Sequence, residues 1–91
     1  MWTVSVPKRV ARQRAGLPQP VRKRLQLLLD EIELYGPVCG TWPNYSALTG
    51  NRYHCHLKKG HPTYVAVWQV ADKSIRLVEV VYVGTHEKAP Y

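Results

Sequence analysis

Residues 52–91 read RYHCHLKKGHPTYVAVWQVADKSIRLVEVVYVGTHEKAPY, and the architecture of the domain follows from the three extended runs in this segment. The runs cover residues 52–58, 63–71 and 74–83, and each is rich in β-branched or aromatic residues. A turn at residues 59–62 separates the first two runs, and a turn centred on Asp72 and Lys73 separates the last two. Turns this short join neighbouring antiparallel strands, so the segment predicts a three-stranded meander.

Two helices are predicted upstream of the meander. Residues 21–35 carry one apolar helical stripe, and Gly36 and Pro37 then end the helix. The stripe consists of Val21, Leu25, Leu28, Leu29 and Ile32. Residues 8–15 are basic and only weakly amphipathic, so they are expected to form a short helix that depends on packing against the sheet.

The remaining segments complete the predicted domain. Apolar and polar side chains alternate over residues 2–6, which predicts a short strand at a sheet edge. Pairing of this strand with a second copy of the chain, as a homodimer, stays open. Residues 38–50 are expected to form a loop in which Trp42 and Tyr45 fill the space between helix and sheet. We therefore predict one α+β domain over residues 1–91, with a strand and two helices preceding the meander. The helices should cover one face of a mainly antiparallel sheet.

The net charge of +7 is large for a chain of 91 residues and favours anionic partners, above all nucleic acid. Seven basic residues and no acidic residue occur between positions 8 and 24. In the longer helix, bases crowd the first turns and acids the last, which is the reverse of what the helix dipole prefers. We interpret Arg22, Lys23 and Arg24 as part of an RNA-binding surface rather than as a purely solvating helical face.

Cys39 and Cys55 are too few for a disulfide framework, and no secretory signal precedes them. No apolar run approaches the length of a membrane span. These features predict a cytoplasmic protein with reduced thiols and no membrane partner.

Strand alternation predicts which face carries the histidines. In the run 52–58, Tyr53, Cys55 and Leu57 share one face, which should lie under the helices. The open face should then carry a row of cations, consisting of Arg52, His54, His56 and Lys58. In the run 74–83 both faces are partly apolar, so its orientation stays open. If Glu79 shares the open face, it could orient a histidine or raise the pKa of that histidine.

The chain resembles the RelE/ParE superfamily of bacterial toxins, and in particular its RelE and HigB ribonuclease branch. The segments that carry the resemblance are LPQPVRKRLQLLLDEIELYGP, YSALTGNRYHCHLKK, YVAVWQV and VEVVYVGTHEKAPY. The resemblance implies the RelE-like fold and a toxin of a toxin–antitoxin system, located in the cytoplasm. It also implies cleavage of mRNA, at the ribosome in many members, with no metal or other cofactor and with inhibition by a cognate antitoxin.

The resemblance also implies site residues. His54 and His56 match an alternating basic pair, Lys58 and Lys59 continue that basic run, and His86 matches the basic residue beyond the glycine of the last strand. Tyr91 matches a C-terminal aromatic residue of the active groove. The expected catalytic residues are His54, His56, His86 and Tyr91. The expected RNA-binding residues are Arg52, Lys58, Lys59, Arg22, Lys23 and Arg24.

Histidines suit acid–base attack of a 2′-hydroxyl on the adjacent phosphate, because both protonation states are accessible near neutral pH. In this interpretation His54 or His56 is the base, and His86 or Tyr91 is the acid or a phosphate ligand. The family often has lysines where this chain has histidines, and an arginine where it has Tyr64 and Val65.

Three alternatives stay open. The first is a metal site built from His54 and His56 with His86, Cys39 or His61, although the chain lacks the common zinc spacings. The second is an inhibitory toxin without nuclease activity, as in the ParE branch. The third is an RNA-binding module that cuts nothing. His61, next to Pro62, is otherwise expected to be an exposed turn residue.

Overall fold

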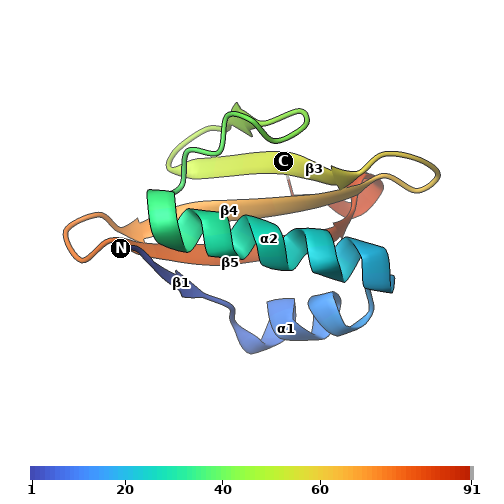
Figure 1. The fold of residues 1–91 in the computed structure, drawn as a ribbon, viewed down its shortest axis with the longest axis horizontal. Coiled ribbons are helices and arrows are strands. Elements are labelled where there is room, and N and C mark those ends of the chain that lie inside the picture. The colour runs from blue at the N-terminus through green and yellow to red at the C-terminus, as the bar shows by residue number, and fades with distance from the viewer. Residues whose placement is uncertain (91) are drawn as a thin grey trace.

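The computed structural model describes residues 1–90 and shows two α-helices packed on a five-stranded sheet (Figure 1). Each predicted element is present. The elements in chain order are β1 Thr3–Ser5, α1 Lys8–Ala15, α2 Gln19–Tyr35, β2 Ser46–Ala47, β3 Arg52–Lys58, β4 Tyr64–Asp72, β5 Leu77–Thr85 and the 3₁₀-helix η1 His86–Lys88. None of the helices in residues 1–90 is both long enough and apolar enough to cross a membrane.

The sheet has the order β1-β5-β4-β3-β2. β3, β4 and β5 form the predicted antiparallel meander, and β1 pairs in parallel with β5 at one edge. The predicted α+β class, with a mainly antiparallel sheet and helices on one face, is therefore confirmed. β3 has the predicted bounds, and α2 begins at Gln19, two residues before the predicted start.

Two local predictions were wrong. β5 begins at Leu77 rather than at position 74, because the Asp72 carboxylate accepts hydrogen bonds from both the backbone N–H and the hydroxyl of Ser74 at 2.9 and 2.7 Å. These bonds stabilise a turn instead of a longer strand. In addition, the predicted loop 38–50 contains β2, which pairs Ser46 with His54 at the second edge of the sheet.

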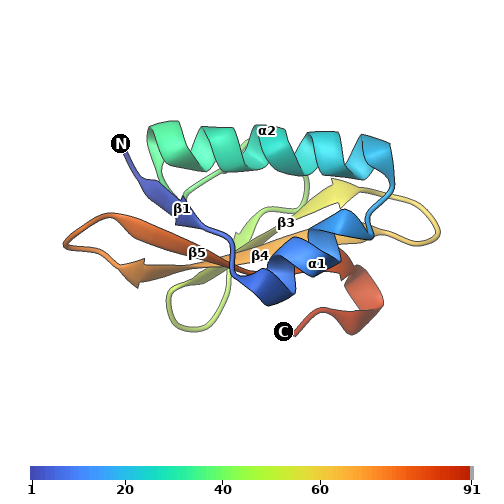
Figure 2. The same cartoon turned by 90° about the horizontal axis from the view of Figure 1, so that it is seen from below.

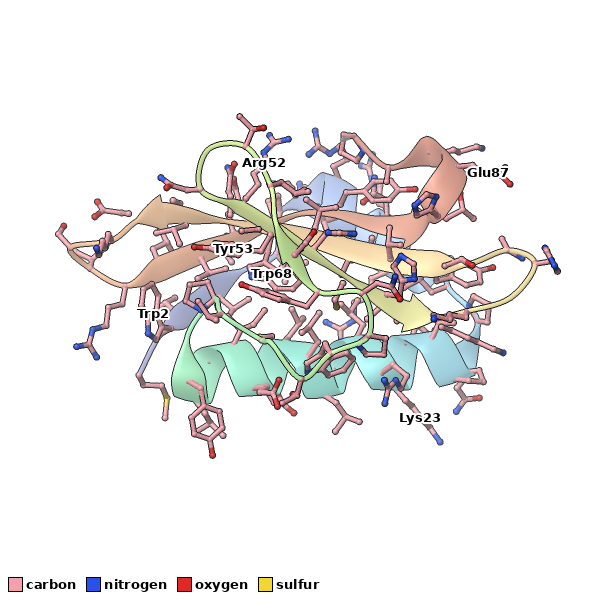
Figure 3. The ribbon with its side chains drawn as sticks, turned by 90° about the horizontal axis from the view of Figure 1, so that it is seen from above. Trp2, Lys23, Arg52, Tyr53, Trp68 and Glu87 are labelled. Atoms are coloured by element: carbon pink, nitrogen blue, oxygen red, sulfur yellow. The ribbon has the colours of Figure 1, made fainter. Side chains whose placement is uncertain are left out.

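The core lies between the helices and one face of the sheet. It contains the whole predicted α2 stripe, together with Cys55 and Leu57 of β3 and Trp68 of β4. The Trp68 indole N–H donates to the Pro37 carbonyl at 2.9 Å, so this buried polar group is satisfied. Figure 3 shows Tyr53 and Trp68 pointing toward α2 and Arg52 pointing away from it, as the alternation of β3 predicts.

A β-bulge explains why the faces of β5 could not be assigned from alternation. Val67 of β4 pairs with Tyr82, whereas its neighbour Trp68 pairs with Val80, so Val81 is an additional residue in β5. The bulge reverses the alternation. Val78 and Val80 before it, and Val83 after it, therefore all face the core.

The C-terminal segment lies on the face of the sheet opposite α2 (Figure 2). On that face, Val65 and Val67 are fully buried between the side chains of β3 and β5. This face therefore has buried apolar side chains of its own, and the histidines of β3 lie beside them.

Candidate active site

Three of the four histidines form a continuous cluster on the face opposite α2. The His54 and His56 ring centroids lie 6.0 Å apart, because alternate residues of β3 point to the same side. The His56 and His86 centroids lie 5.6 Å apart. His86 reaches the cluster because its backbone N–H donates to the Thr63 carbonyl at 2.8 Å, which holds η1 next to the start of β4.

Burial lowers the pKa values of His54 and His56 below the ordinary histidine value. The charges of His54, His86 and Lys59 lower the pKa of His56 further. For His54, the charge of His86 acts in the same direction and a hydrogen bond with Ser46 opposes it. Both rings therefore favour the neutral form, which can accept a proton near neutral pH.

The two ring nitrogens of the central histidine, His56, are not equivalent. Its Nδ1 is buried and has no hydrogen-bond partner within residues 1–90. In His54, by contrast, Nδ1 lies 2.9 Å from the Ser46 hydroxyl, which orients that ring. Nδ1 is therefore shielded from solvent, which leaves Nε2 as the ring nitrogen for contact with another molecule.

His56 and His86 line one concavity of about 410 Å³. The turn between β3 and β4 and the helix η1 form its walls, with His61, Thr63 and Glu87 among the lining residues. His54 is not among the residues that line it. Figure 3 shows Glu87 on the side of the sheet away from α2.

A second concavity, of about 710 Å³, adjoins His56 on its other side, between α2 and β3. A β-bulge between His56 and Lys58 opens it, because Lys58 pairs with the core-packed Tyr64. Lys58 therefore points toward α2, and the prediction that it lies on the open face was wrong. The cations that line this second concavity are Lys23, Arg24, Lys58 and Lys59.

The predicted RNA-binding residues of α2 differ in their contacts. The Arg24 side chain donates from Nε to the Leu57 carbonyl at 3.3 Å, and its guanidinium lies 4.7 Å from the centre of the Trp42 ring. Trp42 in turn donates a hydrogen bond to Glu31. Lys23 is exposed and lines the second concavity, whereas Arg22 is exposed and lines neither concavity.

Arg52 is on the predicted face but outside both concavities. Its Nε donates to the Gln69 side chain at 3.2 Å, and Gln69 donates to Glu79 at 2.9 Å. Glu79 thus shares the open face, where its carboxylate accepts this hydrogen bond from Gln69 on the neighbouring strand β4. It is not among the groups that shift the pKa of His54 or His56, and its role in orienting a histidine stays a prediction.

Of the residues named for a metal site, His54, His56 and His86 lie together in the cluster, whereas Cys39 lies on the core side of the sheet. Cys39 is buried in the core, and burial, with the nearby Glu31 carboxylate, raises the pKa of its thiol to about 12. His61 is exposed in the turn before Pro62. Within residues 1–90, no three histidine, cysteine, aspartate or glutamate side chains are grouped to hold a metal ion.

Tyr91 lies outside the described residues, so its predicted role stays a prediction. Sequence reasoning missed Ser46, Thr63 and Glu87 as neighbours of the histidines. Ser46 and Thr63 lie in or beside turn-rich segments and have no distinctive spacing. The charge of Glu87, next to His86 in a basic chain, was a signal that could have been used.

Solved structures share the fold of this chain over nearly its whole length. The isolated Escherichia coli RelE toxin superposes with a TM-score of 0.71 at 24% identity, covering 99% of this chain and 89% of that chain. An archaeal RelE–RelB complex from Pyrococcus horikoshii gives 0.73 at 20% identity, covering 97% and 98%. The chain has the RelE toxin fold. A mutant of E. coli RelE in the free state gives 0.72 at 23% identity, covering 97% and 86%.

Models of protein families and curated protein sequences gave no significant match. The resemblance of the sequence segments to RelE is thus confirmed at the level of the fold. In this RelE fold, the histidine cluster lies at the end of the sheet where η1, the β3–β4 turn and the basic end of α2 meet.

Proposed function

We propose that this protein is the toxin of a toxin–antitoxin pair and acts as a metal-independent endoribonuclease on mRNA. The observation that carries the proposal is the pairing of His56 and His86, whose rings lie 5.6 Å apart and line one concavity. The RelE fold and the basic surface beside the pair support it.

The proposed reaction divides two proton transfers between these histidines. His56, with its lowered pKa, takes the proton of the RNA 2′-hydroxyl through Nε2. The 2′-oxygen forms a bond to phosphorus, and the bond from phosphorus to the 5′-oxygen breaks. His86 gives its proton to the leaving 5′-oxygen, so the products carry a 2′,3′-cyclic phosphate and a 5′-hydroxyl.

The neighbouring groups have supporting roles in this proposal. Lys58 and Lys59 lie beside His56 and supply positive charge for the doubly charged phosphorane. His54, held by Ser46, acts through its effect on the pKa of His56. Tyr91, and Arg52 further along β3, are assigned to holding the RNA strand, as the family resemblance implies.

The proposed protein partners follow from the RelE fold. Two of the similar structures are RelE toxins in complex with RelB, one archaeal and one from E. coli. We therefore propose a cognate antitoxin that covers the basic end of the molecule, and a ribosome-bound mRNA as substrate. The net charge of +7 is suited to both an acidic antitoxin segment and an RNA strand.

Mapping the ends of RNA after incubation with the protein in a chelator tests the proposal. We expect 2′,3′-cyclic phosphate ends that disappear in His56→Ala and His86→Ala, with Lys73→Ala, in the β4–β5 turn outside both concavities, as a folded control that retains activity. RNA that is bound but left intact, both free and on ribosomes, would instead support an RNA-binding or ParE-like inhibitory protein. Cleavage that stops in chelator would support a metal site.

A further inference from the structure

The outer edge of β5 is paired with a strand over only part of its length. β1 pairs with residues 77–79, and the chain then enters α1 after Pro7, so within residues 1–90 no strand pairs with this edge from position 80 onward. α1 contacts β5, and Figure 1 shows the helix following directly after β1 on this side of the sheet. The backbone groups of the edge therefore need partners other than a strand.

Two side chains of α1 take the place of the missing strand. The Arg9 guanidinium donates to the Val81 carbonyl at 3.1 Å, and the Gln13 side-chain carbonyl accepts from the Val83 N–H at 3.1 Å. Arg9 and Gln13 are four residues apart, so they lie on the same side of the helix. In a parallel ladder, a single residue of an added strand would donate to the first of these backbone groups and accept from the second. The two side chains thus continue the hydrogen bonding that β1 begins.

These bonds lie close to the histidine pair along the chain. Val83 is three residues before His86, and the two residues between them pair with β4. Gln13 therefore holds the outer edge of β5 while β4 holds the inner edge. Because η1 begins where β5 ends, the place of the His86 ring depends on where the last residues of β5 lie.

From this arrangement we infer that Gln13 is a positioning residue for His86. Together with Arg9, it fixes the outer edge of β5 and thereby keeps the His86 ring next to that of His56, with 5.6 Å between the ring centroids. Gln13 does not line the concavity that these two rings share, so it acts on the pair through β5. The inference rests on the proposed nuclease function only for its effect on RNA cleavage.

Four variants test the inference. Gln13→Leu removes the acceptor at nearly constant size, and Gln13→Asn, which is one CH₂ shorter, draws the acceptor away from the Val83 N–H. Gln13→Glu keeps an acceptor at the same reach and should retain the native contact between the histidine rings. The matched control is Gln19→Leu, which makes the same change at an exposed position at the start of α2.

NMR separates positioning from a purely structural role, which would lower stability and leave the histidine pair of the folded molecules unchanged. In Gln13→Leu and Gln13→Asn we expect faster amide exchange at Val83 and a weaker cross-peak between the ring protons of His56 and His86. The pKa of His56 should also move up toward the ordinary histidine value, because a displaced His86 charge lowers it less.

Kinetics give the effect on the proposed reaction. In RNA cleavage by Gln13→Leu and Gln13→Asn, kcat should fall by about tenfold to 10²-fold, the size of effect expected when a reacting group is displaced by about 1 Å. KM should stay close to the native value, because the change affects the placing of His86 and not ground-state binding.

A native cross-peak and a native His56 titration in folded Gln13→Asn would overturn the inference, whatever the stability of the variant. The same changes in Gln19→Leu would also overturn it, since they would not be specific to the edge of β5. If the native protein cuts no RNA, the proposed function fails, and the NMR measurements still decide whether Gln13 positions His86.

Discussion

The rings of His56 and His86 lie 5.6 Å apart and almost perpendicular, at 76°, although one residue belongs to β3 and the other follows β5. The contact depends on the β3–β4 turn and on the hydrogen bond from the His86 backbone to Thr63. The two residues are electrostatically coupled, since the charge of His86 lowers the pKa of His56.

Replacing His86 by alanine should raise the pKa values of His56 and His54. The substitution removes a positive charge that lowers both pKa values, so both should move toward the ordinary histidine value. NMR titration of the imidazole signals measures this directly. The control is His61→Ala, which removes an exposed histidine that does not act on either pKa. An unchanged His56 titration in His86→Ala would contradict the coupling.

The stability of the protein should fall as the pH drops below the ordinary pKa of histidine. His54 and His56 have lowered pKa values in the folded state, so in this range the unfolded chain binds more protons. The free energy of unfolding should therefore decrease as the pH falls from the ordinary histidine pKa to the lowered values. At higher pH these two groups should not change the free energy of unfolding. Urea unfolding at a series of pH values near and below neutrality measures the slope. The double variant His54→Gln, His56→Gln should show a smaller slope, and an equal slope would refute the assignment.

Much of the fold could be predicted because its signals are local. β3 alternates cleanly from Arg52 to Leu57, and the α2 stripe has the helical period over its whole length. The failures have local physical causes as well. The Asp72 side chain bonds Ser74 and delays the start of β5, and the bulge at Val81 reverses the alternation on which face assignment depends.

The site could be predicted only in part, for a similar reason. Alternation places His54 and His56 on one face, and the family resemblance adds His86. Alternation also places Lys58 on that face, but the bulge after His56 turns it toward α2. No sequence pattern marks this bulge, so the second concavity and its connection to the basic end of α2 became visible only in the structure.

Gly84→Ala should disturb both the strand end and the position of His86. A Cβ at this position would lie 2.6 Å from the Tyr82 hydroxyl oxygen and 2.9 Å from the ring carbon that carries it. The Tyr82 hydroxyl also donates to the Thr85 carbonyl at 2.8 Å, so moving this ring removes a contact next to His86. We expect a loss of about 1–3 kcal/mol in the free energy of unfolding, as is typical of overpacking. Gly40→Ala is the control, because a Cβ there meets no atom within 4 Å. Equal stability of the two variants would show that Tyr82 moves aside without cost.

Lys23→Ala and Arg24→Ala should separate RNA binding from structural support. Both residues line the concavity between α2 and β3, but Arg24 also bonds the Leu57 carbonyl and stacks over Trp42. Arg24→Ala should therefore lower the free energy of unfolding by about 0.5–1 kcal/mol, the size of an exposed cation–π contact. Lys23→Ala should leave stability unchanged.

Each variant should also weaken the binding of single-stranded RNA. The slope of log K against log salt concentration should become smaller by about 0.7, which is the effect of one lost phosphate contact. Fluorescence anisotropy at several salt concentrations measures the slope, with Lys73→Ala, which lies in the β4–β5 turn, as the control. A native slope in Lys23→Ala would mean that the RNA does not pass along this end of α2.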